Sequence, residues 1–209
     1  MRRLLYIPIV HNQTDLGSLG NTLSLEGVKK YGTSTWQDHL KQVDISWNKM
    51  ESEISKRVKK ISPDNIKIYQ DGLPVVDETG IKIVKDAAKK GSLNYSIIDN
   101  LLTQGAKLEI AENKEFLFKE YYLMLDIKNA ETPENILKAY LIYQDASKEL
   151  LNDRDNHIAN QINTTLNDGE MGIAFFGAAH SITNKLNKDI DVDVIQMFTD
   201  VISLNLVKG

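Results

Sequence analysis

Runs of apolar residues alternate along the chain with longer stretches in which apolar positions recur every three or four residues. The runs at residues 4–10 and 171–176 have no polar interruption, which is the pattern of strands buried on both faces of a parallel sheet. Shorter runs predict three more strands, at residues 66–69, 107–111 and 192–197. The pattern therefore predicts a largely parallel central sheet of about five strands flanked by helices.

The clearest helical pattern covers residues 34–62. Its apolar positions begin at Trp36, Thr35 is in the position of an N-cap, and Pro63 ends the pattern. The preceding residues 12–33 carry four glycines among polar residues, which predicts a long loop or broken short helices.

Four further helices are expected between the strands. Gly105 ends the second of them, and Thr132 followed by Pro133 opens the fourth. The third is rich enough in aromatic and aliphatic residues to predict a well-buried helix. These helices are expected at residues 78–90, 95–104, 116–125 and 133–166.

Alternating strands and helices predict an α/β fold. With 209 residues, the chain is expected to form a single domain over residues 1–209, with a helical elaboration around residues 34–62 and a long helix around residues 133–166. Its 42% hydrophobic and 26% charged residues are typical of a globular protein. The absence of cysteine excludes disulfides, thiolate nucleophiles, and zinc or iron–sulfur centres held by cysteine.

Charge and hydropathy narrow the choice of partners. The lysine-rich segments at residues 56–60 and 85–90 have acidic residues nearby and no interleaved aromatic residues, and the chain has a net charge of −4. These features favour solvated helix faces over a nucleic-acid interface. The apolar segment after Met1 is short, and no segment reaches the roughly 18 apolar residues of a membrane helix. We therefore expect a cytoplasmic protein that acts on a small molecule or a peptide, with no membrane partner and with homo-oligomer formation left open.

Polar residues follow four of the predicted strands, at the edge where the carboxyl ends of parallel strands meet. His11 follows the first strand, Gln70 and Asp71 the second, Glu112 the third and His180 the fourth. Ligands of open parallel sheets bind beyond this edge. The sequence therefore predicts a functional site made of side chains from separate segments.

Each of these residues also has a structural interpretation. His180, which follows the small residues 177–179, would then be a strand-end histidine hydrogen-bonded to a neighbouring loop, and His11 is open to the same interpretation. Glu112 would be a solvated residue that favours the dipole of the next helix. Asp71 would be part of an ordinary Asp-Gly turn.

Arg154 occupies an unexpected position in the predicted long helix. The apolar stripe of that helix includes Leu150 and Ile158, and Arg154 lies four residues from each, so it should face the core. A buried arginine needs a carboxylate, a carbonyl or an anionic ligand. It is expected either to serve the site or to form a structural ion pair with Asp153, Asp155 or another acid.

Two chemistries fit this set of residues. His11, Asp71, Glu112 and His180 offer the donors of a site for a divalent metal such as Mn, Co, Zn or Fe. Alternatively, Arg154 and the histidines would bind an anionic small molecule. A serine triad is less attractive, because the chain has no Gly-x-Ser-x-Gly elbow.

Several motifs resemble those of a known family. Residues 153–159, Asp-Arg-Asp-Asn-His-Ile-Ala, followed by residues 175–180, Phe-Phe-Gly-Ala-Ala-His, are similar to the C-terminal signature of the TraB/Tiki group, in which an Arg-Asp helix precedes a strand ending Gly-x-x-His. The strand ending at His11 is similar to that group's N-terminal histidine motif. Residues 106–112 are similar to its mid-chain strand ending in glutamate.

The resemblance implies a place in the α/β superfamily that also contains the erythromycin-esterase-like and ChaN-like proteins. It implies a hydrolase, which in Tiki-type members is a metal-dependent peptidase, or a haem-binding protein as in ChaN-like members. Two positions depart from the family pattern. Pro8 stands where a glycine is typical, and the strand that usually ends in an acid here ends Gln70-Asp71.

The leading hypothesis is a metal-dependent hydrolase, peptidase- or esterase-like, with its site at the carboxyl edge of the sheet. His11 and His180, with Glu112 or Asp71, would bind a divalent ion that activates water, and Arg154 would steady an oxyanion or orient a carboxylate. One alternative is a non-catalytic binding module for an anionic small molecule or haem. Another is an interaction scaffold that uses the first predicted helix as its surface.

Overall fold

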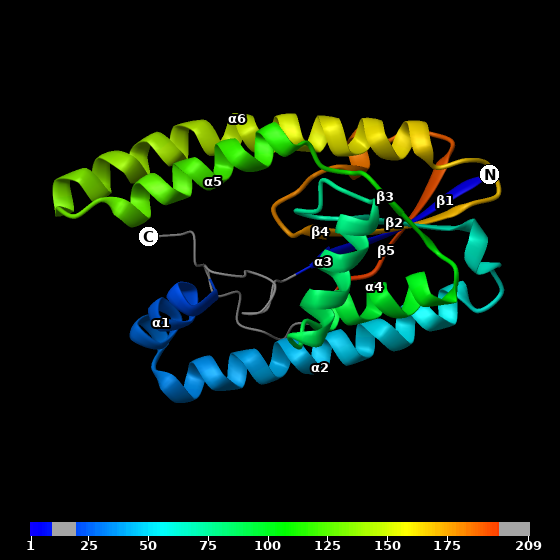
Figure 1. Cartoon of the computed structure of the whole chain (residues 1–209), viewed down its shortest axis with the longest axis horizontal. Coiled ribbons are helices and arrows are strands. Elements are labelled where there is room, and N and C mark those ends of the chain that lie inside the picture. Colours follow the sequence, from blue (N-terminus) through cyan, green and yellow to red (C-terminus); the bar gives the residue numbers. More distant parts are fainter. Residues whose placement is uncertain (10–19, 197–209) are drawn as a thin grey trace.

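Five parallel strands form one sheet within residues 1–9 and 20–196, the part of the chain that the computed structural model describes (Figure 1). The strand order is β3-β2-β4-β1-β5, so the predicted α/β fold with a parallel sheet is confirmed. β4 and β1 are inner strands, which agrees with their uninterrupted apolar sequences. The strands are β1 (Arg2–Ile9), β2 (Ile66–Gln70), β3 (Lys107–Glu109), β4 (Met171–Gly177) and β5 (Ile190–Val194).

Helices cover both faces of the sheet. α2, α3 and α4 share a core with one face, and the C-terminal half of α6 shares a core with the other (Figure 1). The described helices are α1 (Gly20–Tyr31), α2 (Thr33–Val58), α3 (Glu78–Lys89), α4 (Leu93–Gln104), α5 (Lys114–Asn129) and α6 (Pro133–Thr165), with short 3-10 helices at Pro63–Asn65 and Thr183–Lys185.

The two cores follow from the alternation of side chains along each strand. In β1, Leu5, Ile7 and Ile9 belong to the core beneath α2 and α4, whereas Leu4 and Tyr6 belong to the core beneath α6. All five are buried. Because both faces are covered, an inner strand needs an apolar residue at almost every position, and this is why β1 and β4 are recognisable as continuous apolar runs.

α2 buries the apolar stripe that its sequence predicts. The helix starts at Thr33, before the expected cap at Thr35, because Gly32 leads the chain into the helix with a φ of 83° and no side-chain cap. In the preceding segment, expected to be a loop or broken helices, residues 20–31 form α1. The buried residues of α2 include Trp36, Val43, Trp47, Met50 and Ile54.

The boundaries of α3, α4 and α6 lie within two residues of the predicted ones, whereas α5 (Lys114–Asn129) begins before and ends after the predicted residues 116–125. Asp77, Ser92 and Thr132 cap α3, α4 and α6 through their side-chain oxygens, and Pro133 occupies the first position of α6. Gly105 ends α4 in the left-handed region, with a φ of 117°. Local chain chemistry thus sets where these helices begin and end.

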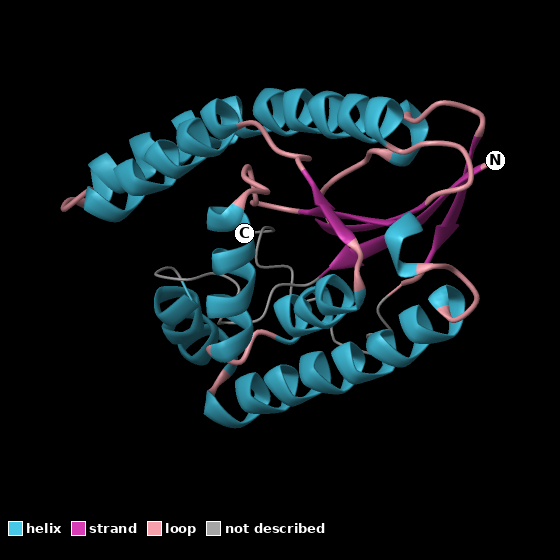
Figure 2. Ribbon diagram, turned by 45° about the vertical axis from the view of Figure 1, so that its right-hand side comes forward, coloured by secondary structure: helices cyan, strands magenta, loops and turns pink. Residues whose placement is uncertain are grey.

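α5 and the N-terminal half of α6 form a helical hairpin that extends past the sheet (Figures 1 and 2). We call this hairpin, residues 114–149, the arm. The prediction of a well-buried helix at residues 116–125 is wrong: every residue of α5 is described, and none is fully buried. The apolar residues of α5 pack on one side against α6, but the hairpin leaves the sheet behind, so nothing in the described chain encloses the other side.

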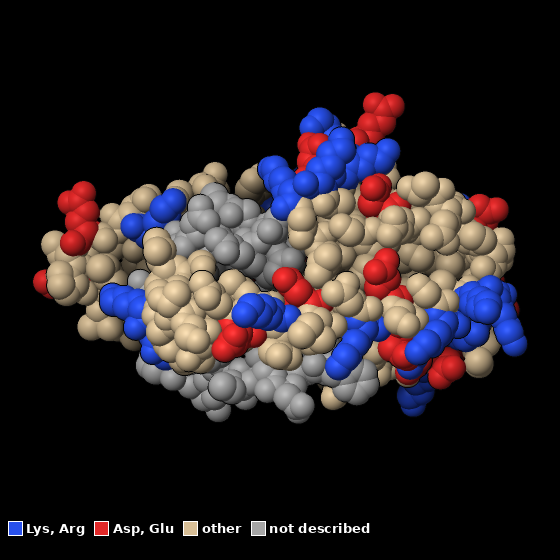
Figure 3. Space-filling model, turned by 90° about the horizontal axis from the view of Figure 1, so that it is seen from below, with Lys and Arg blue, Asp and Glu red and all other residues tan. Residues whose placement is uncertain are grey.

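The described surface carries mixed charge. Figure 3 shows Lys and Arg beside Asp and Glu over the face that includes α2, an arrangement typical of solvated helix faces. On α2, His39 is half-buried, with its ring centroid 5.2 Å from that of Trp36. Among the described helices, none is long and apolar enough to span a membrane.

The loop that joins β2 to α3 is expected to depend on Gly80. A Cβ at this position would lie 2.2 Å from the carbonyl oxygen of Val75, so Gly80→Ala must displace the loop that follows Asp71. We expect a loss of about 1–3 kcal/mol in the free energy of unfolding, measured by urea denaturation, although alanine is the better helix former. Lys85→Ala, on the exposed side of the same helix, should change it by less than about 0.5 kcal/mol. Equal stability of the two variants would contradict the tight contact.

Candidate metal centre

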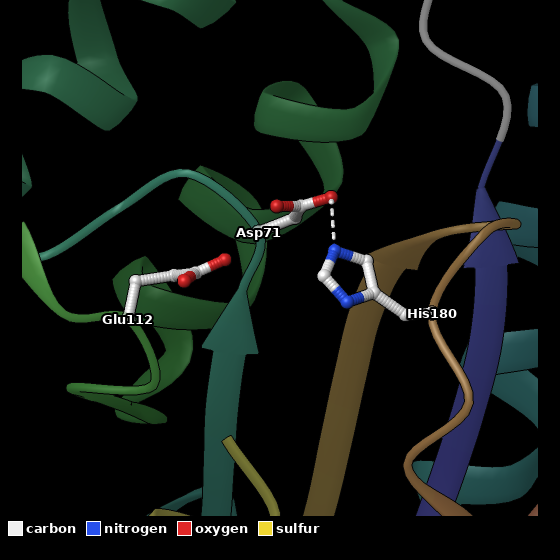
Figure 4. A group of neighbouring side chains, drawn as sticks. All are labelled: Asp71, Glu112 and His180. Carbon is white, nitrogen blue, oxygen red and sulfur yellow. Dashed lines mark ion pairs between the residues drawn. The ribbon is translucent and has the colours of Figure 1, made fainter. Parts of the chain in front are cut away.

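Three side chains that can bind a metal converge at the carboxyl edge of the sheet (Figure 4). Asp71 follows the last residue of β2, His180 lies three residues beyond the end of β4, and Glu112 lies three residues beyond the end of β3. Because β2 pairs with both β3 and β4, the three segments leave the sheet side by side. One ligand atom of each residue lies within 4.8 Å of the other two.

The ring of His180 is held in one orientation. The chain turns tightly after β4, where the N–H of His180 donates to the carbonyl of Gly177 at 2.9 Å. Nδ1 lies 2.6 Å from Oδ1 of Asp155, and the ring of Phe176 packs edge-on against the imidazole. The carboxylate accepts, so Nδ1 is the donor of this contact, and in the neutral ring Nε2 then offers its lone pair to the site. Oδ2 of Asp155 accepts the N–H of Ser181 at 2.9 Å, which fixes this carboxylate in turn.

The carboxylate of Asp71 lies between His180 and Arg154. Its Oδ2 accepts the N–H of Gly177 at 2.8 Å and lies 3.6 Å from Nε2 of His180 (Figure 4). Its Oδ1 accepts from Nη2 of Arg154 at 2.8 Å. The backbone N–H of Asp71 continues the pairing of β2 with β4 by donating to the carbonyl of Phe175 at 2.8 Å. Both the backbone and the side chain of Asp71 are therefore fixed.

Arg154 reaches the site from α6 and binds three carboxylates. Nε and Nη2 contact the two oxygens of Glu112 at 3.3 and 2.5 Å, Nη2 also contacts Asp71, and Nη1 contacts Glu120 at 2.7 Å. Only 6% of Arg154 is exposed, which confirms that it faces the core. Burial by itself would lower the pKa of the guanidinium, but Glu112 and the other carboxylates raise it above its ordinary value. These contacts use four of the five N–H groups of the guanidinium.

Glu112 is the most enclosed acid of the site, with 0% of its side chain exposed. Burial raises the pKa of its carboxyl group, Arg154 lowers it in part, and the charge of Asp71 raises it again. The N–H of Gly72 adds a hydrogen bond of 3.4 Å to Oε1. One arginine therefore compensates the charge of this carboxylate incompletely.

Tyr6 supports the turn that carries His180. Its hydroxyl donates to the carbonyl of His180 at 3.2 Å. Burial, with the charges of Asp155 and Asp71, raises the pKa of Tyr6 to about 12, so the phenol keeps its proton and remains a donor.

The site holds more negative charge than its arginine balances. Four carboxylates contact Arg154 or His180. They belong to Asp71, Glu112 and Glu120, which contact Arg154, and to Asp155, which contacts His180. In addition, Oδ2 of Asp71 and Nε2 of His180 face each other across 3.6 Å. In the neutral ring both atoms are acceptors, which repel unless a proton or a cation lies between them. Two ligands of a tetrahedral ion with bonds of about 2.1 Å are about 3.4 Å apart, so this spacing suits a metal such as zinc.

Four of the predicted site residues meet in the structure: Asp71, Glu112, Arg154 and His180. His11 lies outside the described residues. Gln70 is directed to the opposite face of the sheet, where its side chain accepts a hydrogen bond of 3.2 Å from Asn94. Because side chains alternate along a strand, the next residue, Asp71, is directed toward the site. The carboxylate expected at the end of this strand is therefore present, one position after Gln70.

Two carboxylates at the site, Asp155 and Glu120, have no site role predicted from the sequence. Asp155 is expected only as an ion-pair partner of Arg154, whereas in the structure it orients His180. Its position beside Arg154 and three residues before Ile158 is the one signal that it faces the core. Glu120 carries no such signal, because its contact with Arg154 depends on how α5 packs against α6.

Removal of the buried cation should destabilise the fold more than removal of a surface arginine. Arg154→Met leaves Asp71, Glu112 and Glu120 without their common partner, and we expect a loss of about 3–5 kcal/mol in the free energy of unfolding. Arg57→Met is the matched control, because Arg57 pairs with two carboxylates but is 32% exposed, and its loss should cost less than about 1 kcal/mol. Similar losses in urea denaturation would show that Arg154 does not hold the site together.

Comparison with known proteins leaves the site to be interpreted from its own chemistry. The chain matches no protein-family model, no curated protein and no solved structure. What the site can bind therefore follows from the identity, burial and spacing of its side chains.

Proposed function

We propose that this chain is a cytoplasmic metal-dependent hydrolase of the peptidase or esterase type, related to the TraB/Tiki group. Asp71, Glu112 and His180 would bind a divalent metal such as Zn, Mn, Co or Fe. The observation that best supports this function is the facing pair of acceptors, Oδ2 of Asp71 and Nε2 of His180, in a buried site with surplus carboxylates.

The residues around the three ligands suit this chemistry. A divalent ion bound there would lower the pKa of a coordinated water and so supply the nucleophile for cleavage of an ester or peptide bond. Asp155 accepts from Nδ1 of His180 and so favours the tautomer in which Nε2 is free to bind a metal. A carboxylate commonly has this role beside a metal-binding histidine. Gly177 and Arg154 hold the two oxygens of Asp71 in place.

Arg154 takes a positioning role in this proposal. Four of its hydrogen bonds go to carboxylates, so it orients the ligands Asp71 and Glu112, and little of its donor capacity is left for the oxyanion of a substrate. This corresponds to the second of the two roles expected from the sequence, orientation of a carboxylate.

A binding module for an anionic small molecule or haem has less support. Four carboxylates converge on this edge, and a second anion would be repelled by the same charges that attract a cation. The charge of the site therefore favours a metal ion over an anionic ligand.

Metal binding is the first test of the proposal. Titration calorimetry of the metal-free chain with Zn²⁺, Mn²⁺ and Co²⁺ should show one ion per chain for at least one of the metals. Asp71→Asn and His180→Gln should each weaken binding by more than about 100-fold, because each removes a ligand, and Asp155→Asn should weaken it by about 10–100-fold, because it only orients one.

Two variants away from the site serve as controls, one with the same histidine-to-glutamine change and one with the same change of an acid to an amide. His157→Gln alters a half-buried histidine that contacts Phe116 instead of the site, and Glu78→Gln alters an exposed acid at the start of α3. Both should bind the metal as the unaltered chain does. No stoichiometric binding, or equal losses in His157→Gln and His180→Gln, would exclude this metal centre.

Hydrolysis is the second test. The metal-loaded chain should cleave an ester or a peptide, and a chelator should abolish the activity until the metal is restored. Glu112→Gln, which keeps the shape of the side chain, should lower kcat/KM by at least about tenfold, whereas Glu78→Gln should not change it. A chain that binds one metal ion but cleaves neither class of substrate would be a metal-binding module, and the assignment as a hydrolase would be wrong.

A further inference from the structure

The outer side of α5 carries the exposed large aromatic side chains of the described chain. Phe118, Tyr121 and Tyr122 are 58%, 49% and 60% exposed, and with Leu125 they form a stripe at positions i, i+3, i+4 and i+7. The opposite side of the helix, with Phe116 and the residues that follow at helical spacing, packs against α6. A helix that is apolar on both sides is typically enclosed on both sides.

We propose that a second copy of this chain covers the outer stripe of α5, with the two α5 helices antiparallel across a twofold axis. The arm extends past the sheet (Figures 1 and 2), and the large exposed fractions of Phe118, Tyr121 and Tyr122 show that no described segment encloses this side of α5. Two helical hairpins joined in this way form a four-helix arrangement, the usual means by which such hairpins enclose their apolar faces. The contact is independent of the metal centre.

Charge on the arm supports a second copy over an unrelated partner. Lys119 and Asp126 are exposed, lie on the same side of the stripe and are seven residues apart, with Tyr122 near their midpoint. In an antiparallel pair with twofold symmetry, the same sides of the two helices face each other. Lys119 is then opposite Asp126 of the partner subunit, and symmetry repeats this pair at the other end of the contact.

The exposed area indicates the strength of the contact. Three aromatic rings, each about half exposed, would bury on the order of 600 Å² over the two copies, before the flanking side chains are counted. That area is below the roughly 1,200 Å² of a standard specific interface, so the flanking side chains must contribute and the contact is weak. We therefore expect a dimer that forms at high protein concentration and dissociates on dilution.

A charge exchange tests the proposed pairing. Sedimentation equilibrium of the full chain should show a monomer–dimer equilibrium, and Lys119→Asp or Asp126→Lys alone should weaken it by about tenfold, because each places like charges opposite one another twice. The double variant, Lys119→Asp with Asp126→Lys, should restore the affinity of the unaltered chain. All of these positions are exposed, so each variant should keep the thermal stability of the parent.

Substitution of the stripe provides the second arm of the experiment. Tyr122→Asp should abolish the dimer, whereas Leu137→Asp, at a 58% exposed position on the other helix of the arm, should leave it intact. A chain that stays monomeric from micromolar to millimolar concentration overturns the proposal, including the case in which the monomer instead binds lipid vesicles. Failure of the double variant to restore the dimer, or an equal effect of Leu137→Asp and Tyr122→Asp, also overturns it.

Discussion

Arg154 joins four separate segments of the chain through one guanidinium. Asp71 comes from the end of β2, Glu112 from the segment after β3 and Glu120 from α5, and all three meet the arginine on α6. A buried ion costs several kcal/mol unless it is paired, so other arrangements of these loops are unfavourable. The carboxyl edge of the sheet therefore has a defined geometry even though loops build most of it.

The same arrangement leaves the site with an electrostatic imbalance. One guanidinium faces several carboxylates, and the oriented ring of His180 directs Nε2 at Oδ2 of Asp71, 3.6 Å away. An apolar core at this position would be easier to stabilise, because it would not require desolvation of these charges. Proteins accept such local costs mainly at functional sites, which is why the imbalance supports a role in binding a cation.

The arm has a different unfavourable feature, an exposed apolar helix face. α5 has aromatic residues on the side that packs against α6 and on the side that does not, and the sheet ends before it can cover the second side. An apolar pattern shows that a helix needs to be covered, but it does not show what covers it. The prediction of a buried α5 is wrong for the monomer for this reason, and the proposed dimer would supply the missing cover.

The sequence by itself determines the α/β fold, the boundaries of α3, α4 and α6 to within two residues, and four of the residues at the site. Continuous apolar runs are required wherever a strand is covered on both faces, and parallel strands bring Asp71, Glu112 and His180 to one edge whatever the details of the loops. Arg154 is recognisable because a charged residue on an apolar stripe needs a buried partner.

Only the tertiary structure decides how these residues are connected. Asp155 orients His180 instead of pairing with Arg154, and Glu120 joins the site from a helix that carries no signal of it. Hydrogen bonds form between atoms a few ångströms apart in space, whereas periodicity specifies only which face of an element a side chain occupies. The rotation and offset with which α5 and α6 pack therefore determine which acid meets which base, and that information is not local to any segment of the sequence.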